Sequence, residues 1–168
     1  MEKIVIIYGS SSGNTESAAK TISSKFDSGM VDLCDVSKVA VGDLAKYSNL
    51  ILGTSTWGIG DLQDDWEGFI VKLKEADLTG KKVALFGLGD SDSYADSFVD
   101  GMGIIYEAIK DKGCEIIGQV AVDDYSFVES QAVVDNRFVG LPLDEDNECN
   151  LSEDRINNWV NQLKPAFN

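Results

Sequence analysis

The chain of 168 residues contains no histidine and only three cysteines, Cys34, Cys114 and Cys149. The cysteines are odd in number, far apart and without CxxC spacing, so they cannot provide a disulfide framework. Because a Cys/His zinc site needs an imidazole, that class of centre is excluded, and we expect no metal site. Cys34 lies within the apolar run Val31–Val36, which predicts a core residue rather than a reactive thiol.

Long apolar runs are also missing. No stretch approaches the roughly 20 apolar residues that a helix needs to span a bilayer. The first residues, Met1-Glu2-Lys3 followed by a short apolar run, do not have the layout of a signal peptide. We therefore expect a cytoplasmic protein without membrane insertion.

Basic residues are scarce relative to acidic ones. The chain has 14 Lys and Arg against 29 Asp and Glu, which gives a formal net charge of −15 and an isoelectric point near 4.2. Since a field of this sign repels phosphate backbones and anionic membrane surfaces, nucleic-acid binding is not expected. The same field favours partner proteins with basic docking faces. Charge alone leaves open whether the acidic excess serves only solubility.

The composition fits one globular domain. Hydrophobic residues make up 43% of the chain and charged residues 26%, and a chain of this length can bury a core without disulfides. We therefore expect a single domain over residues 1–168. Short apolar runs alternate with amphipathic segments, a pattern typical of βαβ units and a parallel sheet in the α/β class.

This alternation predicts five strands and four main helices. The predicted strands cover Ile4–Tyr8, Val31–Val36, Leu50–Gly53, Lys82–Gly87 and Glu115–Gly118. The predicted helices cover Asn14–Phe26, Asp64–Lys74, Phe98–Lys112 and Leu151–Phe167, the last with Ser152 as its N-cap. Right-handed crossovers favour the doubly wound order 2-1-3-4-5, with helices on both faces and a ligand crevice beyond the carboxyl ends of strands 1, 3 and 4.

One stretch breaks the alternation. Between Gly118 and Leu143, strand-like pieces at Gln119–Val122 and Phe138–Leu141 flank a run of polar and aromatic residues. We interpret this stretch as an insertion that splits the last strand, and not as a second domain.

The loop after the first predicted strand, Gly9-Ser10-Ser11-Ser12-Gly13-Asn14-Thr15-Glu16, is rich in hydroxyl groups and directly precedes a helix. Such a loop points hydroxyls and backbone N–H groups at one spot, where the helix dipole adds positive potential, so it predicts a phosphate cradle. It contains no Lys or Arg, which argues against a nucleotide hydrolase, and no nucleophile for a cysteine phosphatase. Taken alone, the same residues could form only a serine-rich turn and helix cap.

Two further loops, after the third and fourth predicted strands, each present an aromatic ring among small polar residues, Trp57 in one and Tyr94 in the other. Rings in such loops are well placed to stack on a flat ligand, although either could also cover the core. Gly87-Leu88-Gly89 lacks a third glycine, since Asp92 occupies that position, so a dinucleotide fingerprint is not supported. Together, the three loops predict a ligand with a phosphate at one end and a planar ring at the other.

These loops resemble those of the flavodoxin family, specifically its long-chain branch, and the likeness runs from Lys3 to Phe167. Ser10-Ser11-Ser12-Gly13-Asn14-Thr15 matches the family's [Ser/Thr]-x-[Ser/Thr]-Gly-x-Thr phosphate loop. Thr56-Trp57-Gly58-Ile59-Gly60 with the following Leu62–Glu67 is similar to the first flavin loop, and Gly89-Asp90 with Tyr94-Ala95-Asp96 is similar to the second. Gly118–Leu143 followed by Asp144–Asn147 resembles the insertion and return found in long-chain members.

The resemblance implies non-covalently bound flavin mononucleotide, FMN, as the cofactor. Trp57 would lie over one face of the isoalloxazine ring and Tyr94 on the other, while backbone groups of both flavin loops would bond the polar edge of the ring. Asp90, Ser97 and Asp146 are expected to contact the ribityl chain and the ring. The complete set of expected cofactor-binding residues is Ser10, Ser11, Ser12, Gly13, Asn14, Thr15, Ser55, Thr56, Trp57, Gly58, Ile59, Gly60, Leu88, Gly89, Asp90, Tyr94, Ser97 and Asp146. No catalytic residue is expected.

The resemblance also implies an electron carrier rather than a substrate-converting enzyme. Asp61, Asp90, Asp92 and Asp96 lie in the flavin loops without any Lys or Arg, so a reduced, anionic ring would be destabilised there. We therefore expect a low-potential one-electron carrier that cycles mainly between semiquinone and hydroquinone. Its expected partners are flavoprotein reductases and other oxidoreductases with basic docking faces, and we expect a monomer.

Gly58 departs from the family pattern, because many long-chain members carry a side chain at this position. In the family, the peptide after this position turns its carbonyl toward flavin N5 when the ring gains a proton and an electron. Glycine permits such a rotation at little steric cost. We therefore expect a comparatively stable neutral semiquinone.

Two other classes share features with this sequence. A flavin-dependent reductase would need space above the ring and a group that binds its substrate, whereas Trp57 and Tyr94 are expected to cover both faces and no loop supplies an arginine. A receiver-type signalling domain shares the 2-1-3-4-5 order. It would need an aspartate at the end of strand 3, where this chain has Thr54, and acidic pairs after strand 1, where it has hydroxyls.

Overall fold

The computed structural model describes residues 1–168, and its regular elements alternate between strands and helices. The strands of the main sheet are β1 (Ile4–Gly9), β2 (Val31–Asp35), β3 (Asn49–Trp57), β4 (Asp61–Leu62), β5 (Lys82–Leu88), β6 (Glu115–Ile117) and β10 (Leu141–Leu143). The smaller strands are β7 (Val120–Ala121), β8 (Val133–Val134) and β9 (Arg137–Phe138). The helices are α1 (Asn14–Ser24), α2 (Asp64–Leu73), α3 (Asp100–Ile109) and α4 (Ser152–Leu163), and the 3-10 helices are η1 (Val36–Lys38), η2 (Val41–Lys46), η3 (Ala95–Ser97) and η4 (Cys149–Leu151).

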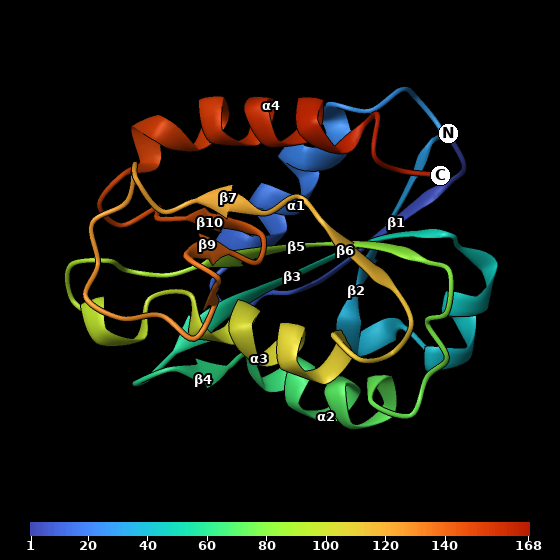
Figure 1. Ribbon diagram of the computed structural model, residues 1–168, viewed down its shortest axis with the longest axis horizontal. Coiled ribbons are helices and arrows are strands. Elements are labelled where there is room, and N and C mark those ends of the chain that lie inside the picture. The colour runs from blue at the N-terminus through green and yellow to red at the C-terminus, as the bar shows by residue number, and fades with distance from the viewer.

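The main sheet lies between two layers of helices (Figure 1). Its strand order is β2-β1-β3-β5, and both β6 and β10 pair in parallel with the outer edge of β5. Helices α1 and α4 cover one face, and α2 and α3 cover the other. The predicted order 2-1-3-4-5 is therefore confirmed, with the fifth position shared by β6 and β10.

The sheet separates two hydrophobic cores because successive strand residues point to opposite faces. In β1, Ile4 and Ile6 pack toward α1 and α4, whereas Val5 and Ile7 pack toward α2 and α3. Every residue of β1 is buried, as expected for a central parallel strand that is covered on both faces. Cys34 in β2 is half-buried against the core on the side of α2 and α3, and burial raises the pKa of its thiol.

The third strand continues beyond the predicted Leu50–Gly53 and ends at Trp57. Its parallel pairing with β5 extends to Ser55, and Thr56 and Trp57 then pair antiparallel with β4. Thr54 and Ser55 are buried in spite of their polar side chains. The prediction ended the strand too early because pairing with two neighbouring strands outweighs the turn preference of these small polar residues.

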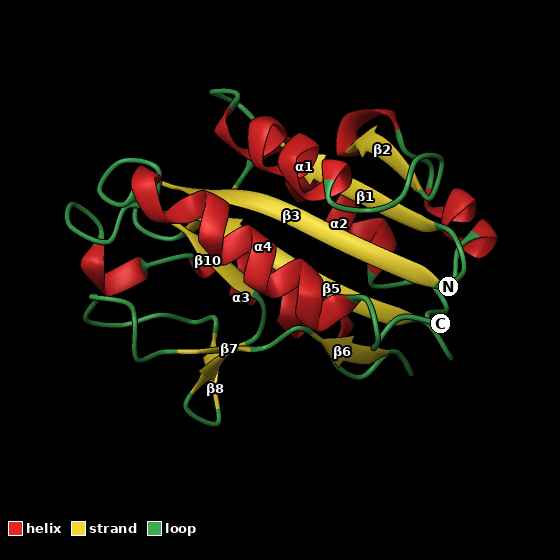
Figure 2. Ribbon diagram, turned by 90° about the horizontal axis from the view of Figure 1, so that it is seen from above, coloured by secondary structure: helices red, strands yellow, loops and turns green.

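The insertion predicted between Gly118 and Leu143 covers residues 118–140 in the structure, because β10 begins at Leu141. It lies at the edge of the sheet that β6 and β10 form (Figure 2). Three of its short strands form an antiparallel sheet of order β7-β9-β8. Its aromatic side chains Tyr125, Phe127 and Phe138 pack on Phe98, which lies two residues before the start of α3. The prediction of an insertion that splits the last strand is confirmed, because β6 and β10 flank it and pair with the same strand.

The predicted strand piece Phe138–Leu141 is divided between two sheets. Phe138 ends β9, Leu141 begins β10, and the buried Gly140 lies between them. A Cβ atom at Gly140 would lie only 2.0 Å from the carbonyl oxygen of Leu85 in β5. The chain therefore passes against the backbone of β5 at a residue where no side chain fits.

The helix starts differ from the prediction at two places. Helix α3 begins at Asp100 and not at Phe98. Ser152 is not the N-cap of α4 but its first helical residue, and its hydroxyl donates to Glu145. The N-cap position belongs to Leu151, whose φ of −97° and ψ of −12° are helical because η4 leads straight into α4, whereas a side-chain cap needs an extended residue. None of the helices is both long enough and apolar enough to cross a membrane.

Candidate functional site

A cleft of about 280 Å³ opens where β1, β3 and β5 end, at the edge where the sequence predicted a ligand crevice. The three predicted loops contribute most of its wall. The residues that line it are Ser12, Asn14, Ser55, Thr56, Trp57, Gly58, Leu88, Gly89, Asp90, Tyr94, Ser97, Glu145 and Asp146. The other predicted residues lie in the same loops without lining the cleft, namely Ser10, Ser11, Gly13, Thr15, Ile59 and Gly60.

One end of the cleft is formed by the loop before α1. Gly13 occupies the N-cap position with a φ of +96°, and no side chain caps the helix. The first N–H groups of α1 therefore remain available to a ligand, at the end of the helix where the dipole is positive. Ser10 Oγ accepts a hydrogen bond from Gly13 N at 3.0 Å, which fixes the loop. Ser12 and Asn14 reach the cleft itself.

Gln63 links this loop to the next one, a role that the sequence analysis missed. Its side-chain oxygen accepts from Asp65 N at 3.1 Å and caps α2, while its Nε2 donates to Ser11 Oγ at 3.2 Å. A Cβ atom at Gly9 would lie 2.3 Å from Gln63 Oε1. Glycine at the end of β1 therefore allows α2 to approach the hydroxyl-rich loop.

Trp57 forms a second wall of the cleft, at the end of β3. Its side chain is 42% exposed, and its ring N–H donates to Ser55 Oγ at 2.8 Å, which fixes the orientation of the indole. A tight turn follows, closed by Gly60 N donating to Trp57 O at 3.2 Å. Gly58 has a φ of +51° and Gly60 a φ of +107°, values that L residues rarely adopt. Ile59, at the tip of the turn, is 88% exposed.

Tyr94 forms the third wall, in the segment between β5 and α3. Its side chain is 47% exposed, so a large part of the ring remains uncovered. Asp90 holds this segment, because its Oδ1 accepts from Ser93 N at 2.9 Å and from Asp92 N at 3.1 Å. These hydrogen bonds, above all the one from Ser93, and a further one from Asn147 lower the pKa of the Asp90 carboxyl.

The cleft carries acidic groups and no cation. Asp90, Glu145 and Asp146 line it, and no Lys or Arg does. Burial raises the pKa of Asp146, and the negative charges of Asp90, Asp144 and Glu145 raise it further. Glu145 was not among the predicted residues, although its position in the acidic run directly after the last strand was a usable signal.

Comparison with known proteins agrees with this geometry. The family model described as Flavodoxin matches residues 6–159. A flavodoxin from Nostoc sp. is 47% identical over 166 residues, covering 99% of this chain and 98% of the relative. A flavodoxin from Synechocystis sp. is also 47% identical, covering 99% of each chain.

Solved structures extend the comparison to three dimensions. The crystal structure of Fusobacterium nucleatum flavodoxin bound to flavin mononucleotide superposes with a TM-score of 0.95 at 30% identity, covering 100% of both chains. Family model, relatives and structure agree over nearly the whole length. The protein therefore belongs to the flavodoxin family.

Proposed function

We propose that this protein holds FMN non-covalently in the cleft and carries single electrons between redox enzymes. Flavodoxins are electron-transfer flavoproteins and do not convert a substrate, so family membership supports a carrier. The observation that carries the proposal is the cleft itself. It joins a hydroxyl-rich helix start without any cation to two aromatic rings that each leave more than two fifths of their surface exposed.

The residues at the start of α1 fit a phosphate. A phosphate there would meet the uncapped amides of α1 and the hydroxyl of Ser12. Ser10, Ser11, Gly13 and Thr15 would shape this cradle from behind, since they belong to the same loop. Dipoles and hydrogen bonds alone would stabilise the phosphate, because no basic side chain is present.

The opposite end of the cleft fits a planar heterocycle. Trp57 would cover one face and Tyr94 the other, and both rings are half-exposed without an aromatic partner within the chain. Backbone groups of Gly58 and Gly89 face the same space and would bond the polar edge of the ring. When bound, FMN supplies the one-electron chemistry, and the chain supplies its position and its electrostatic environment.

The acidic lining favours a low potential. Asp90, Glu145 and Asp146 would repel the negative charge that accompanies full reduction, and no cation offsets them. For a one-electron couple, each tenfold weakening of binding to the reduced form relative to its precursor lowers the potential by about 59 mV. We therefore infer that the carrier works mainly between the half-reduced and fully reduced states of the flavin.

The further attributes of the carrier rest on the family and on the sequence. We propose a cytoplasmic monomer that forms one FMN-binding domain over residues 1–168. The insertion at residues 118–140 supports assignment to the long-chain branch. The net charge of −15 supports redox partners with basic docking faces.

Titration of the apoprotein with FMN tests the proposed function. We expect the flavin fluorescence to be quenched and the bound flavin to turn from yellow to blue on partial reduction. Trp57→Ala should weaken binding of both FMN and riboflavin, because it removes a ring contact shared by the two. If the folded protein bound no FMN, the proposal would fail, and if NADPH alone rapidly bleached the bound flavin, a reductase would replace the carrier.

A further inference from the structure

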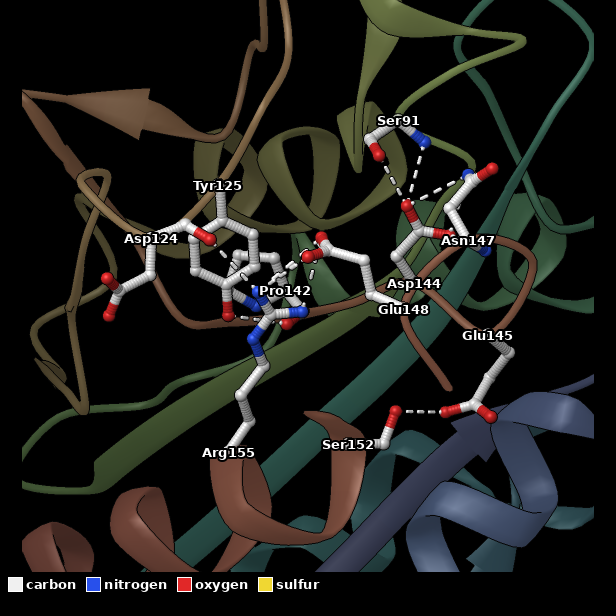
Figure 3. A network of polar contacts seen from close by, with 10 residues as sticks. All are labelled: Ser91, Asp124, Tyr125, Pro142, Asp144, Glu145, Asn147, Glu148, Ser152 and Arg155. Carbon is white, nitrogen blue, oxygen red and sulfur yellow. Dashed lines mark hydrogen bonds and ion pairs between the residues drawn. The ribbon is translucent and has the colours of Figure 1, made fainter. Parts of the chain in front are cut away.

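Asp144 is a fully buried carboxylate just beyond the end of β10 (Figure 3). No cation pairs with it. Its Oδ2 accepts from the backbone N of Ser91 at 3.1 Å and from the Ser91 hydroxyl, and its Oδ1 accepts from Asn147 N at 3.0 Å. The Asn147 side-chain amide lies 3.1 Å and 3.0 Å from its two oxygens. A buried carboxylate that is compensated only by hydrogen bonds needs all of these donors.

These contacts attach the segment that carries Tyr94 to the chain after β10. Asn147 Nδ2 also donates to Asp90 Oδ1 at 2.8 Å, and the same Asp90 oxygen accepts from two backbone amides of its own segment. Gly89 N donates to Leu143 O at 3.1 Å at the start of the segment. We call Asp144, Ser91, Asn147 and Asp90 the Asp144 network.

Asp144 itself does not line the cleft, although its neighbours Glu145 and Asp146 do. Its influence on a ligand must therefore pass through Ser91 and Asn147. From these observations we propose that Asp144 is a positioning residue for the flavin ring, which holds the segment of Asp90 and Tyr94 in place. This inference rests on the proposed function, because it concerns the same cleft.

The role of Asp144 requires a carboxylate, and an amide of the same size cannot replace it. Every group that Asp144 contacts in the network is a donor, namely a backbone N–H or hydroxyl of Ser91 and the backbone and side-chain N–H groups of Asn147. An asparagine would be nearly the same size but would turn one NH₂ group toward donors. Asp144→Asn therefore replaces one acceptor oxygen by a donor with little change in packing volume.

The test compares FMN with riboflavin on the apoprotein of Asp144→Asn. Because the network holds the ring side of the cleft and not the phosphate side, both affinities should fall by the same factor, about tenfold, and their ratio should be unchanged. Hydrogen exchange at the Ser91 amide should accelerate in the same variant. Ser91→Ala removes one donor and should give a smaller loss of about threefold for both ligands.

Two controls separate this role from general destabilisation. Glu148→Gln removes the same charge four residues further along, but Glu148 pairs with Arg155, which also contacts Asp124 O and the Tyr125 ring on the insertion side. It should leave both affinities within about twofold of the wild type. Ser12→Ala, in the loop before α1, removes a hydroxyl on the phosphate side of the cleft and should weaken FMN binding while sparing riboflavin.

The outcomes are distinguishable. The positioning role would be overturned, while the wild type still binds FMN, by any of three results. Asp144→Asn could bind both ligands as tightly as the wild type, it could lose affinity for FMN alone, or Glu148→Gln could lose as much affinity as Asp144→Asn. Should Asp144→Asn fail to fold, Ser91→Ala alone decides: an equal loss of affinity for FMN and riboflavin supports the positioning role, and wild-type affinities or a loss for FMN alone overturn it. A wild-type protein that binds no FMN would instead remove the proposed function.

Discussion

Gly58 is the residue of the predicted flavin loops whose backbone conformation bears most directly on the first reduction step. It lies in the turn after Trp57 with a φ of +51°, and a Cβ atom there would come within 2.7 Å of Asp61 Oδ2. Any side chain at this position would restrict rotation of the following peptide and displace the Asp61 carboxylate. The resemblance described above implies that rotation of this peptide accompanies formation of the half-reduced flavin.

We therefore expect Gly58→Asn to make the potential of the first one-electron reduction more negative, since asparagine tolerates positive φ but restricts the rotation. Redox titration of wild type and variant under the same conditions measures the difference. Gly29→Asn is the matched control, because Gly29 has a φ of +81° and open space around it, far from the cleft. An unchanged first potential in Gly58→Asn would contradict the rotation argument.

Tyr47 offers a pH-dependent test at the opposite end of the sheet. Its hydroxyl donates to Asp32 Oδ2 at 2.6 Å, and this hydrogen bond, together with burial, raises the pKa of Tyr47 to about 12. A folded-state pKa above the unfolded value means that the bond stabilises fully below about pH 10 and is lost as the pH rises toward 12.

Relative to Tyr47→Phe, the wild type should therefore lose stability between about pH 10 and 12, and denaturant unfolding over that range measures the loss. A stability difference between the two proteins that stays constant across this range would show that the hydrogen bond does not control the titration of Tyr47.

The residues that the sequence analysis missed share one physical feature. The three loops were identifiable because their composition is unusual and because parallel strands end at one edge of the sheet. Gln63 and Asp144 became relevant only through tertiary contacts, since nothing in their local sequence indicates which loop they approach. Residue types predict chemistry, whereas supporting contacts depend on how distant segments pack.

At the scale of elements, two glycines give opposite predictions. Gly140 separates β9 from β10, and its Cβ would lie 2.0 Å from a backbone oxygen of β5. Gly68 lies inside α2, where a Cβ would meet nothing within 4 Å. Gly140→Ala should lower the free energy of unfolding by at least about 2 kcal/mol through overpacking, whereas Gly68→Ala should raise it by about 0.5–1 kcal/mol through helix propensity. Urea unfolding of both variants is the measurement, and a neutral Gly140→Ala would show that β10 can move away from β5 at little cost.

The elements were predictable where hydrophobic pattern and pairing agree. Buried runs such as Ile4–Tyr8 identified the central strands to within a residue or two. The end of β3 and the division between β9 and β10 were not predictable, because both depend on which strand the segment meets and not on its own residues. The prediction of Ser152 as the N-cap of α4 was wrong for a related reason, because η4 leads Leu151 into the helix without an extended residue.

For the molecule as a whole, the cleft and the ion-paired cations occupy different parts of the surface. The cations that form ion pairs, among them Lys3, Lys25 and Arg155, do not line the cleft. The cleft keeps its carboxylates without a cation, next to the exposed Trp57 and Ile59. A partner with a basic face would therefore be oriented toward the flavin end by the field, in addition to being attracted by the net charge.

This arrangement predicts how salt affects electron transfer. Reduction of a partner with a basic docking face should slow by about tenfold or more from low ionic strength to about 0.5 M. The added salt shortens the Debye length and so screens the attraction between the two charged surfaces. Stopped-flow measurement with the reduced protein tests this, with an uncharged quinone as the control acceptor, whose reduction rate should change little. Parallel salt dependences for the charged and the uncharged acceptor would mean that the charge of −15 serves solubility and does not steer the partner.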